Sequence, residues 1–337
     1  MSRQRVHVLV LRDSPALVSV GLMDMLRKAD ALAAELSPTP RRLATTLVSP
    51  GPDRTVALAG GIRLECEATI DEVDVPDLVV VPALDPDIQE HLELNAAVPP
   101  WLRRVYDAGA DVASACTGAF ALAEAGLLDG KAATTHWAFQ ADLARRYPAV
   151  ELRPQAIIVD QGRVVTAGGA TSFLSLSLHL VERLLGGEIA RAASKMFLID
   201  PNKSPQGAYA IFGPQKAHGD EEILRAQGII EQELALPLTV DDLARQVVMS
   251  RRNFVRRFTA ATGNSPREYL QRARIEAAKR ALETTRRPVA TVASDVGYED
   301  VVAFRRMFAR ITGLAPSAYR ARYGLAEPGA LVSSRRA

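Results

Sequence analysis

The sequence predicts two domains of different architecture: an α/β domain with a mainly parallel sheet, followed by an all-α domain. The chain has 337 residues, a length that exceeds what one hydrophobic core usually serves, and 48% of the residues are hydrophobic. Short β-branched runs alternate with helical patterns over roughly the first 200 residues, and the strand patterns then stop. Because the charge is also nearly balanced, disorder of the whole chain is excluded.

Residues 1–199 are predicted to form the first domain, since strand and helix patterns follow one another there in βαβ order. VHVLVL at residues 6–11 and DLVVVP at residues 77–82 have the length and composition of buried strands. A hairpin is expected around Gly162, where turn-forming residues separate two apolar runs. A further strand is predicted at residues 110–115, and helices at residues 21–34, 88–108 and 172–185.

Residues 200–217 are predicted to be a linker, because prolines and glycines interrupt every pattern there. The second domain is predicted at residues 218–326, and residues 327–337 are expected to be a frayed tail. The two parts of the chain also differ in net charge. Residues 1–217 include 21 basic and 25 acidic residues, whereas residues 218–337 include 20 basic and 14 acidic residues. The basic second half suggests a face for nucleic acid, although solvated helix faces would give the same count.

An internal repeat organises the second domain. The repeated residues, 50 positions apart, are Phe254, Phe258, Gly263, Pro266 and Tyr269 in the first copy and Phe304, Phe308, Gly313, Pro316 and Tyr319 in the second. A short helix precedes each copy, at residues 240–247 and 289–296, so each unit is predicted to be a helix-turn-helix. Val248 stands where the second unit has Gly297, so the first turn is expected to differ slightly if the backbone needs a positive φ.

The second helix of each unit is expected to turn its phenylalanine pair inward and its opposite face toward the DNA major groove. Arginine can bond guanine there, and apolar side chains can touch the thymine methyl group. The predicted DNA-binding residues are Arg251, Arg252, Val255, Arg256, Thr259, Val301, Val302, Arg305 and Arg306. Contacts to phosphate are predicted for Arg251, Arg257, Arg267, Arg272, Arg274 and Arg310.

Residues 239–323 resemble the DNA-binding domain of the AraC family of bacterial transcription regulators. The resemblance rests on the double unit, on an RxRxxxAKRAL-like connecting segment that begins at Arg272, and on GLAPSAYR at residues 313–320. It implies binding to double-stranded promoter DNA, usually activation through contact with RNA polymerase, and often a homodimer.

In the first domain the most distinctive segment is DVASACTGAFALAEAGLLDGKAATTHW, which starts at Asp111. Small residues surround Cys116 where a strand meets a helix, so the cysteine is expected on a sharp turn with a thiol pKa lowered by the helix N-terminus. His136 follows 20 residues later and could act as a base, but a buried structural cysteine is the alternative for so general a pattern.

Residues 6–185 resemble the PfpI-like branch of the class I glutamine-amidotransferase-like superfamily, which implies a flavodoxin-like fold. Two features carry the resemblance: Cys116 on the sharp strand-to-helix turn, which we call the elbow, and the TTH segment ending at His136. Together with an AraC-type domain, this is the arrangement of GlxA-type regulators.

Departures from the enzymes of that superfamily argue against catalysis. Val18 stands at the place of their acidic residue, and Ala83-Leu84 replaces glycines whose amides would hold an oxyanion. The cleft at the carboxyl ends of the strands is instead expected to bind a small-molecule effector. The predicted lining residues are Cys116, Thr117, His136, Trp137, Leu84 and Val18.

Two alternatives to a sensor pocket remain open at this point. The first domain could be a cysteine-dependent amidase or glyoxalase-like enzyme in a protein that also binds DNA, or its pocket could be vestigial and the domain could serve only for dimerisation. We expect no metal and no cofactor, since the five histidines are scattered and Gly168-Gly169 lacks a phosphate-loop context. Two cysteines, no export signal and no long apolar run predict a cytoplasmic protein without a membrane segment.

Overall fold

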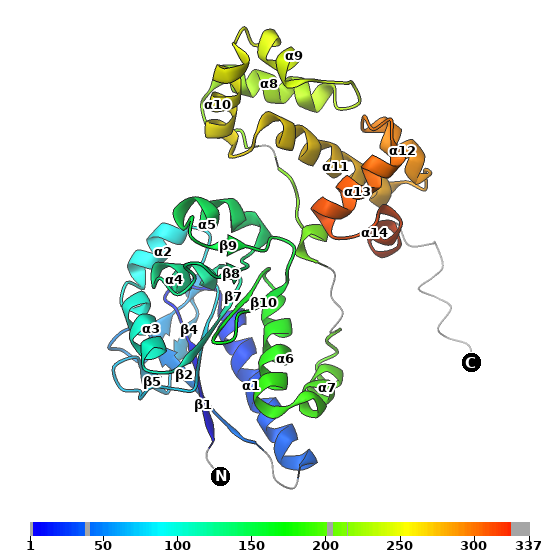
Figure 1. Ribbon diagram of the computed structural model, residues 1–337. Helices are drawn as coiled ribbons and strands as arrows, with labels where there is room; N and C mark the ends of the chain where they lie inside the picture. Colours follow the sequence, from blue (N-terminus) through cyan, green and yellow to red (C-terminus); the bar gives the residue numbers. More distant parts are fainter. Residues whose placement is uncertain (1–2, 38–40, 201–204, 214, 325–337) are drawn as a thin grey trace, which may run out of the picture. The chain divides into compact units, whose positions relative to one another are not determined.

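The computed structural model describes residues 3–37, 41–200, 205–213 and 215–324 (Figure 1). It divides into two compact units, with the boundary between Gln206 and Gly207. The boundary lies inside the segment predicted to be a linker. The predicted tail, residues 327–337, lies outside the described residues, as do residues 325–326 of the predicted second domain.

The N-terminal unit is built on a seven-stranded sheet. All neighbouring strands are parallel except the pair at one edge, β10 and β11, which form the hairpin predicted around Gly162. The strands in spatial order are β10 (Ile158–Asp160), β11 (Val164–Ala167), β7 (Asp111–Ala115), β6 (Leu78–Val81), β1 (Gln4–Leu9), β2 (Leu43–Ser49) and β5 (Ala68–Thr69). Two small ribbons accompany this sheet, β3 (Thr55–Ala57) with β4 (Arg63–Glu65) and β8 (Ala132–Ala133) with β9 (Glu151–Leu152).

Helices cover both faces of the sheet because its central strands are apolar on both sides. In β1 the side chains of Val6 and Val8 enter one core, whereas that of Leu9 enters the other. The first core is covered by α1 (Ala16–Leu36), α6 (Ser172–Leu185) and α7 (Gly187–Met196). The second is covered by α2 (Ile88–Leu94), α3 (Val98–Asp107), α4 (Ala119–Glu124) and α5 (Gln140–Arg146).

The prediction of one helix over residues 88–108 is wrong. The structure has two helices there, α2 and α3, separated at Asn95–Ala97. Pro99 and Pro100 occupy the first turn of α3, where a missing N–H costs nothing, but they could not lie inside a continuous helix. Asn95 is buried at the break and its side chain binds the backbone of Arg12, so the interruption also ties α2 to the segment after β1.

The C-terminal unit is entirely helical within its described residues. Two small cores form around equivalent aromatic side chains: Phe258 packs edge-on against Tyr269 at 5.2 Å in the first, and Phe308 against Tyr319 at 5.4 Å in the second. The helices are α8 (Glu221–Gln232), α9 (Val240–Gln246), α10 (Arg251–Thr262), α11 (Pro266–Thr284), α12 (Val289–Asp295), α13 (Val301–Thr312) and α14 (Pro316–Tyr323). The sequence repeat is therefore a repeat of structure, joined by α11. None of the helices in the described ranges is long and apolar enough to cross a bilayer.

Candidate functional site

Each helix-turn-helix of the C-terminal unit is held by local capping contacts. Thr239 and Asp242 form a reciprocal capping box at the start of α9, and the Ser250 hydroxyl accepts the Asn253 N–H at the start of α10. In the second unit, Pro288 precedes α12 and the Asp300 carboxylate accepts the Val302 N–H. These caps fix where α10 and α13, the second helices of the two units, begin.

The expected difference between the two turns is not observed. Val248 has a φ of 54°, in the same left-handed region as Gly297 at 82°. The valine side chain is 88% exposed, so it avoids a packing clash while accepting an unfavourable backbone conformation.

The outward faces of α10 and α13 carry most of the predicted DNA-binding residues. Phe254 and Phe258 are fully buried on the inner face of α10, and Phe304 and Phe308 on that of α13. The residues that point outward and are exposed are Arg251, Arg252, Arg256, Thr259, Val302, Arg305 and Arg306, whereas Val255 and Val301 are half-buried. Val301 packs against the second core.

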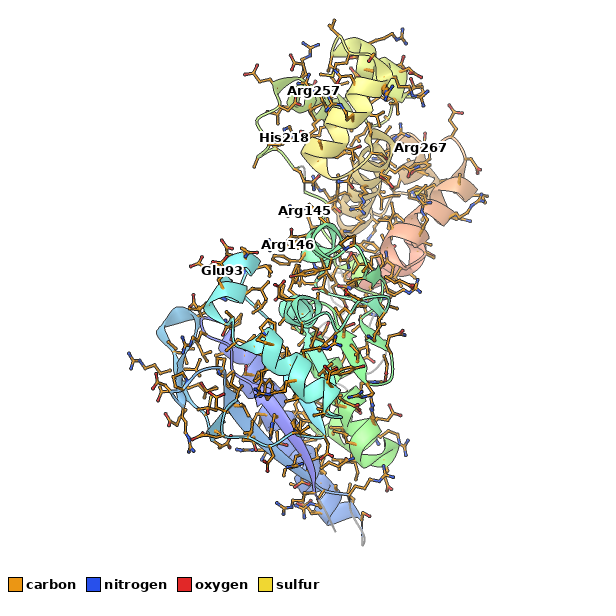
Figure 2. All side chains as sticks on the ribbon, turned by 60° about the vertical axis from the view of Figure 1, so that its left-hand side comes forward. Glu93, Arg145, Arg146, His218, Arg257 and Arg267 are labelled. Atoms are coloured by element: carbon orange, nitrogen blue, oxygen red, sulfur yellow. The ribbon has the colours of Figure 1, made fainter. Side chains whose placement is uncertain are left out.

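Two arginines predicted to contact phosphate are instead engaged inside the C-terminal unit. Arg257, which is labelled in Figure 2, is one of them. It pairs with Asp220 through two hydrogen bonds of 2.9 and 2.7 Å and also reaches Glu222. Arg274 donates to the carbonyl oxygens of Leu234 and Leu236. Both guanidinium groups join segments about 40 residues apart, so their interactions stabilise the fold. The other predicted phosphate contacts, Arg251, Arg267, Arg272 and Arg310, are exposed.

In the N-terminal unit, Cys116 occupies a strained turn at the carboxyl end of β7. Its φ is 57°, and the 3-10 turn η2 (Cys116–Gly118) leads into α4. Gly118 permits the turn, because a Cβ there would lie 2.3 Å from the Pro82 carbonyl oxygen. The Thr117 hydroxyl donates to the Leu84 carbonyl oxygen at 2.6 Å, which fixes the turn against the segment after β6.

The expected activation of the Cys116 thiol is contradicted. Burial raises the pKa of Cys116, and hydrogen bonds from Thr117 oppose this effect only in part. Cys116 is 7% exposed and belongs to the same core as Val18, and α4 is only six residues long. Desolvation of the thiolate therefore opposes the activation that the helix terminus was expected to provide.

His136 follows Thr135, a hydrogen-bond partner of Cys116, but no hydrogen bond joins His136 itself to Cys116 within the described residues. Its Nδ1 accepts the Ala138 N–H at 3.2 Å, and its ring lies 5.1 Å from that of Trp137. Burial lowers the pKa of His136, which favours the neutral ring. The link to the elbow is made by Thr135, whose hydroxyl donates to the Cys116 carbonyl oxygen at 3.0 Å.

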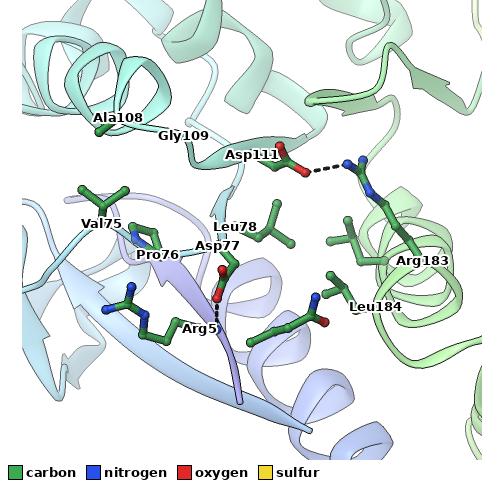
Figure 3. Close-up of a pocket in the computed structure, with 12 residues that line it drawn as sticks. Arg5, Val75, Pro76, Asp77, Leu78, Ala108, Gly109, Asp111, Arg183 and Leu184 are labelled. Carbon is green, nitrogen blue, oxygen red and sulfur yellow. Dashed lines mark hydrogen bonds and ion pairs between the residues drawn. The ribbon is translucent and has the colours of Figure 1, made fainter. Parts of the chain in front are cut away.

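The residues predicted to line an effector site are tightly packed. Cys116, Thr117, Leu84 and Val18 are all buried, and His136 and Trp137 are half-buried. An open cavity of about 590 Å³ lies instead at the amino-terminal edge of the sheet, beside the first residues of β1, β6 and β7 (Figure 3). Its charged side chains include Arg183, which pairs with Asp111 at 2.5 Å. No motif in the sequence pointed to this cavity, because its residues are scattered over distant segments.

Gln206 is a buried polar residue that the sequence reasoning missed, since it falls in the predicted linker. It is 3% exposed and its side chain enters the N-terminal unit beside Thr134 and Thr135. Only its position between prolines and glycines was visible in the sequence, and that composition indicates a loop.

Comparison with known proteins identifies both units. The family model of the DJ-1/PfpI family matches residues 5–183, and that of a helix-turn-helix domain matches residues 243–322. The chain belongs to the DJ-1/PfpI family. Within the family, this member carries a C-terminal helix-turn-helix domain, as the resemblance to GlxA-type regulators implied.

Relatives of this DJ-1/PfpI protein include regulators that match most of its length. The HTH-type transcriptional regulator GlxA of Rhizobium meliloti is 25% identical over 328 residues, which cover 95% of this chain and 97% of that protein. The HTH-type transcriptional regulator GbdR of Pseudomonas aeruginosa is 27% identical over 282 residues, 83% of this chain and 75% of that protein. An enzyme, isonitrile hydratase of Pseudomonas putida, is 31% identical over 139 residues, 40% of this chain and 58% of that protein.

The fold of the N-terminal unit is also that of the DJ-1/PfpI family. The crystal structure of Drosophila melanogaster DJ-1beta matches with a TM-score of 0.51 and 18% identity. The match covers 59% of this chain and 100% of the DJ-1beta chain. This similarity confirms the predicted flavodoxin-like fold.

Proposed function

We propose that the protein is a DNA-binding transcription regulator whose N-terminal unit binds a small-molecule effector. The observation that carries the proposal is the repeated helix-turn-helix, in which α10 and α13 bury their phenylalanines and expose arginines on the opposite face. The full-length relationship to GlxA supports the same function for both units together.

DNA binding would use α10 and α13 in adjacent major grooves. The connecting helix α11 has 19 residues and therefore a length of about 28 Å at 1.5 Å per residue. Successive major grooves on one face of DNA are about 34 Å apart, so one chain can reach two of them. Arg252, Arg305 and Arg306 would read base edges, and Val302, which is 63% exposed, would touch a thymine methyl group.

Effector binding at the elbow would regulate this DNA binding. The elbow lies at the carboxyl ends of parallel strands, where α/β proteins bind ligands, and Val18 leaves it without an acidic partner for Cys116. Binding at this site would have to open the packing around Cys116, so occupied and empty states would differ in structure. By analogy with the AraC-type resemblance, we further propose a cytoplasmic homodimer that activates promoters through RNA polymerase.

A cysteine-dependent enzyme is the second candidate, favoured by the isonitrile hydratase relative and by the elbow geometry at Cys116. Two observations argue against an enzyme: the pKa of the Cys116 thiol is raised, and Nδ1 of His136 already accepts the Ala138 N–H. Incubation with isonitriles, amides and α-oxoaldehydes distinguishes the two candidates. Turnover that disappears in Cys116→Ala would establish the enzyme, whereas no consumption by the wild type supports a sensor.

Selection of bound fragments from the genome of the source organism tests DNA binding by the full-length protein. We expect enrichment of promoter fragments with two short conserved blocks one helical turn apart. The double variant Arg252→Ala, Arg306→Ala should lose this enrichment, and Arg191→Ala, an exposed arginine of the N-terminal unit, should retain it. The proposal would be refuted if the wild type recovered each fragment at the same frequency as in the input DNA.

A further inference from the structure

The carboxamide of Gln206 fills a small polar site at the end of the N-terminal unit. Its Nε2, which carries two N–H groups, lies within hydrogen-bond distance of three oxygens: Thr134 Oγ1 at 2.7 Å, the Thr135 carbonyl at 3.1 Å and the Ala156 carbonyl at 2.9 Å. Two of these partners are carbonyl oxygens, which can only accept, so the nitrogen of the amide must face them. The site is thus a set of three acceptor oxygens around one donor nitrogen.

Gly168 keeps this site open. A Cβ at residue 168 would lie 2.5 Å from Gln206 Nε2 and 2.7 Å from the Thr135 carbonyl oxygen. The other end of the carboxamide is not matched in the same way, because Gln206 Oε1 is buried and accepts no hydrogen bond from the described residues. An unpaired buried acceptor is unfavourable, so the missing partner of Oε1 weakens the hold of the site on the Gln206 side chain.

The acceptor site is directly connected to the elbow. Thr134 and Thr135 immediately precede His136, and the Thr135 hydroxyl donates to the Cys116 carbonyl oxygen. Thr135 therefore binds the elbow through its side chain and Gln206 through its backbone. Thr135 is thus a single residue in contact with both positions.

Immediately after Gln206 the chain is bound to the C-terminal unit. We call residues 208–212 the strap. Ala208 is 3% exposed in the second aromatic core, and Phe212 packs at 5.1 Å against Tyr269 of the first.

The buried Lys279 of α11 fastens the middle of the strap. Its ammonium group donates to the Ala210 carbonyl oxygen and to Glu276, which in turn accepts the Phe212 N–H at 3.2 Å. The strap thus contacts both helix-turn-helix cores, and Gly207 alone separates it from the Gln206 anchor.

We propose that the three oxygens around Gln206 Nε2 form an effector subsite for an ammonium or primary amide group, which the chain occupies with its own side chain. An effector that binds there displaces Gln206 and releases the anchor that precedes the strap, which loosens the connection between the two helix-turn-helix cores. This inference rests on the proposed effector-controlled function, for which it names the chemical class of the ligand and the element that responds.

Chemical rescue tests the subsite in the full-length protein. Gln206→Ala empties the site, so acetamide should bind the variant and raise its melting temperature far more than that of the wild type. At ten times its Kd, acetamide would increase the ratio of folded to unfolded protein about tenfold. N,N-dimethylacetamide, which lacks an N–H donor, is the matched control and should give no such increase. Equal effects of acetamide on variant and wild type, or equal effects of the two amides, would overturn the subsite.

Hydrogen exchange tests the response of the strap. Gln206→Met keeps the packing volume but removes the donor, so amide exchange in residues 208–212 should rise about tenfold while exchange in β7 stays unchanged. Unchanged exchange in the strap would overturn the coupling. Neither measurement uses DNA, so failure here is distinct from failure of the genomic selection, which tests the proposed function itself.

Discussion

Val248 and Gly297, at matching positions of the two helix-turn-helix units, share a left-handed backbone conformation although only one of them is a glycine. A non-glycine residue pays about 1–2 kcal/mol in this region because its Cβ approaches the following carbonyl oxygen. The first turn therefore stores strain that the second does not.

Replacement of Val248 by glycine should stabilise the protein by about 1 kcal/mol, since the strain is relieved and the exposed valine packs on little. Urea unfolding monitored in the full-length protein measures this change. Val302→Ala, an exposed valine in a regular helix, is the control and should change stability by less than about 0.5 kcal/mol. A less stable Val248→Gly variant would contradict the strain.

Two other glycines, which do not have left-handed backbones in common with Gly297, should respond in opposite directions when a Cβ is added. Gly118→Ala should destabilise the N-terminal unit by about 2 kcal/mol or more, because the new Cβ meets the Pro82 and Val81 carbonyl oxygens. Gly228→Ala should stabilise the C-terminal unit by about 0.5–1 kcal/mol, since it lies within α8 with no atom within 4 Å of the new Cβ. Thermal unfolding of both variants checks the pair, and the same sign for both would contradict the close approach at the elbow.

Arg257 and Arg256 are adjacent but should serve different purposes. Arg257→Ala should lower the free energy of unfolding because it removes the partner of Asp220, whereas Arg256→Ala should leave stability unchanged and weaken DNA binding. The hydrogen bonds from Arg257 hold the pKa of Asp220 below its usual 3.8.

The contribution of this pair therefore has a defined pH dependence. A lowered carboxylate pKa stabilises the folded state above the ordinary pKa, and the benefit is lost as the pH falls through the lowered value. The stability difference between wild type and Arg257→Ala should persist at pH 6 and shrink below about pH 4, as measured by urea unfolding at each pH. A difference that grows on acidification would contradict the assignment.

Cys116 should react slowly with thiol reagents. In a Cys66→Ser background, its modification by a disulfide reagent at neutral pH should be at least about tenfold slower than that of free cysteine and should accelerate as the pH rises, because the thiol is buried and its pKa is raised. The substitution removes Cys66, whose pKa burial raises to about 12. Rapid reaction at pH 6 would indicate an activated nucleophile and would favour the enzyme.

The sequence predicted those features that depend on local pattern. The spacing of Phe254, Phe258 and Tyr269 repeats in Phe304, Phe308 and Tyr319, and this periodicity alone located both units. The small residues around Cys116 likewise predicted the strained turn that the structure contains.

Features that depend on contacts between distant residues were not visible. The pairing of Arg257 with Asp220 joins positions 37 residues apart, and the burial of Cys116 follows from the packing of several elements. Gln206 was hidden for a further reason: its surroundings in sequence indicate a loop, whereas its partners come from residues 134, 135 and 156. Secondary-structure propensity depends on the local segment. The pKa of Cys116 and the burial of Gln206 depend instead on residues that the fold brings together from distant segments.

The salt dependence of DNA binding tests the central claim most directly. Fluorescence anisotropy of a labelled duplex recovered by the genomic selection would measure binding by three full-length proteins. These are the wild type, the double variant Arg252→Ala, Arg306→Ala and the control Arg191→Ala. We predict that log K falls linearly with log salt, by about 0.9 for each phosphate contacted, and that the double variant binds at least about tenfold more weakly while the control stays within about twofold. Binding that is insensitive to salt, or that is unaffected by the loss of both arginines, would contradict the assignment of α10 and α13 as the DNA-reading helices.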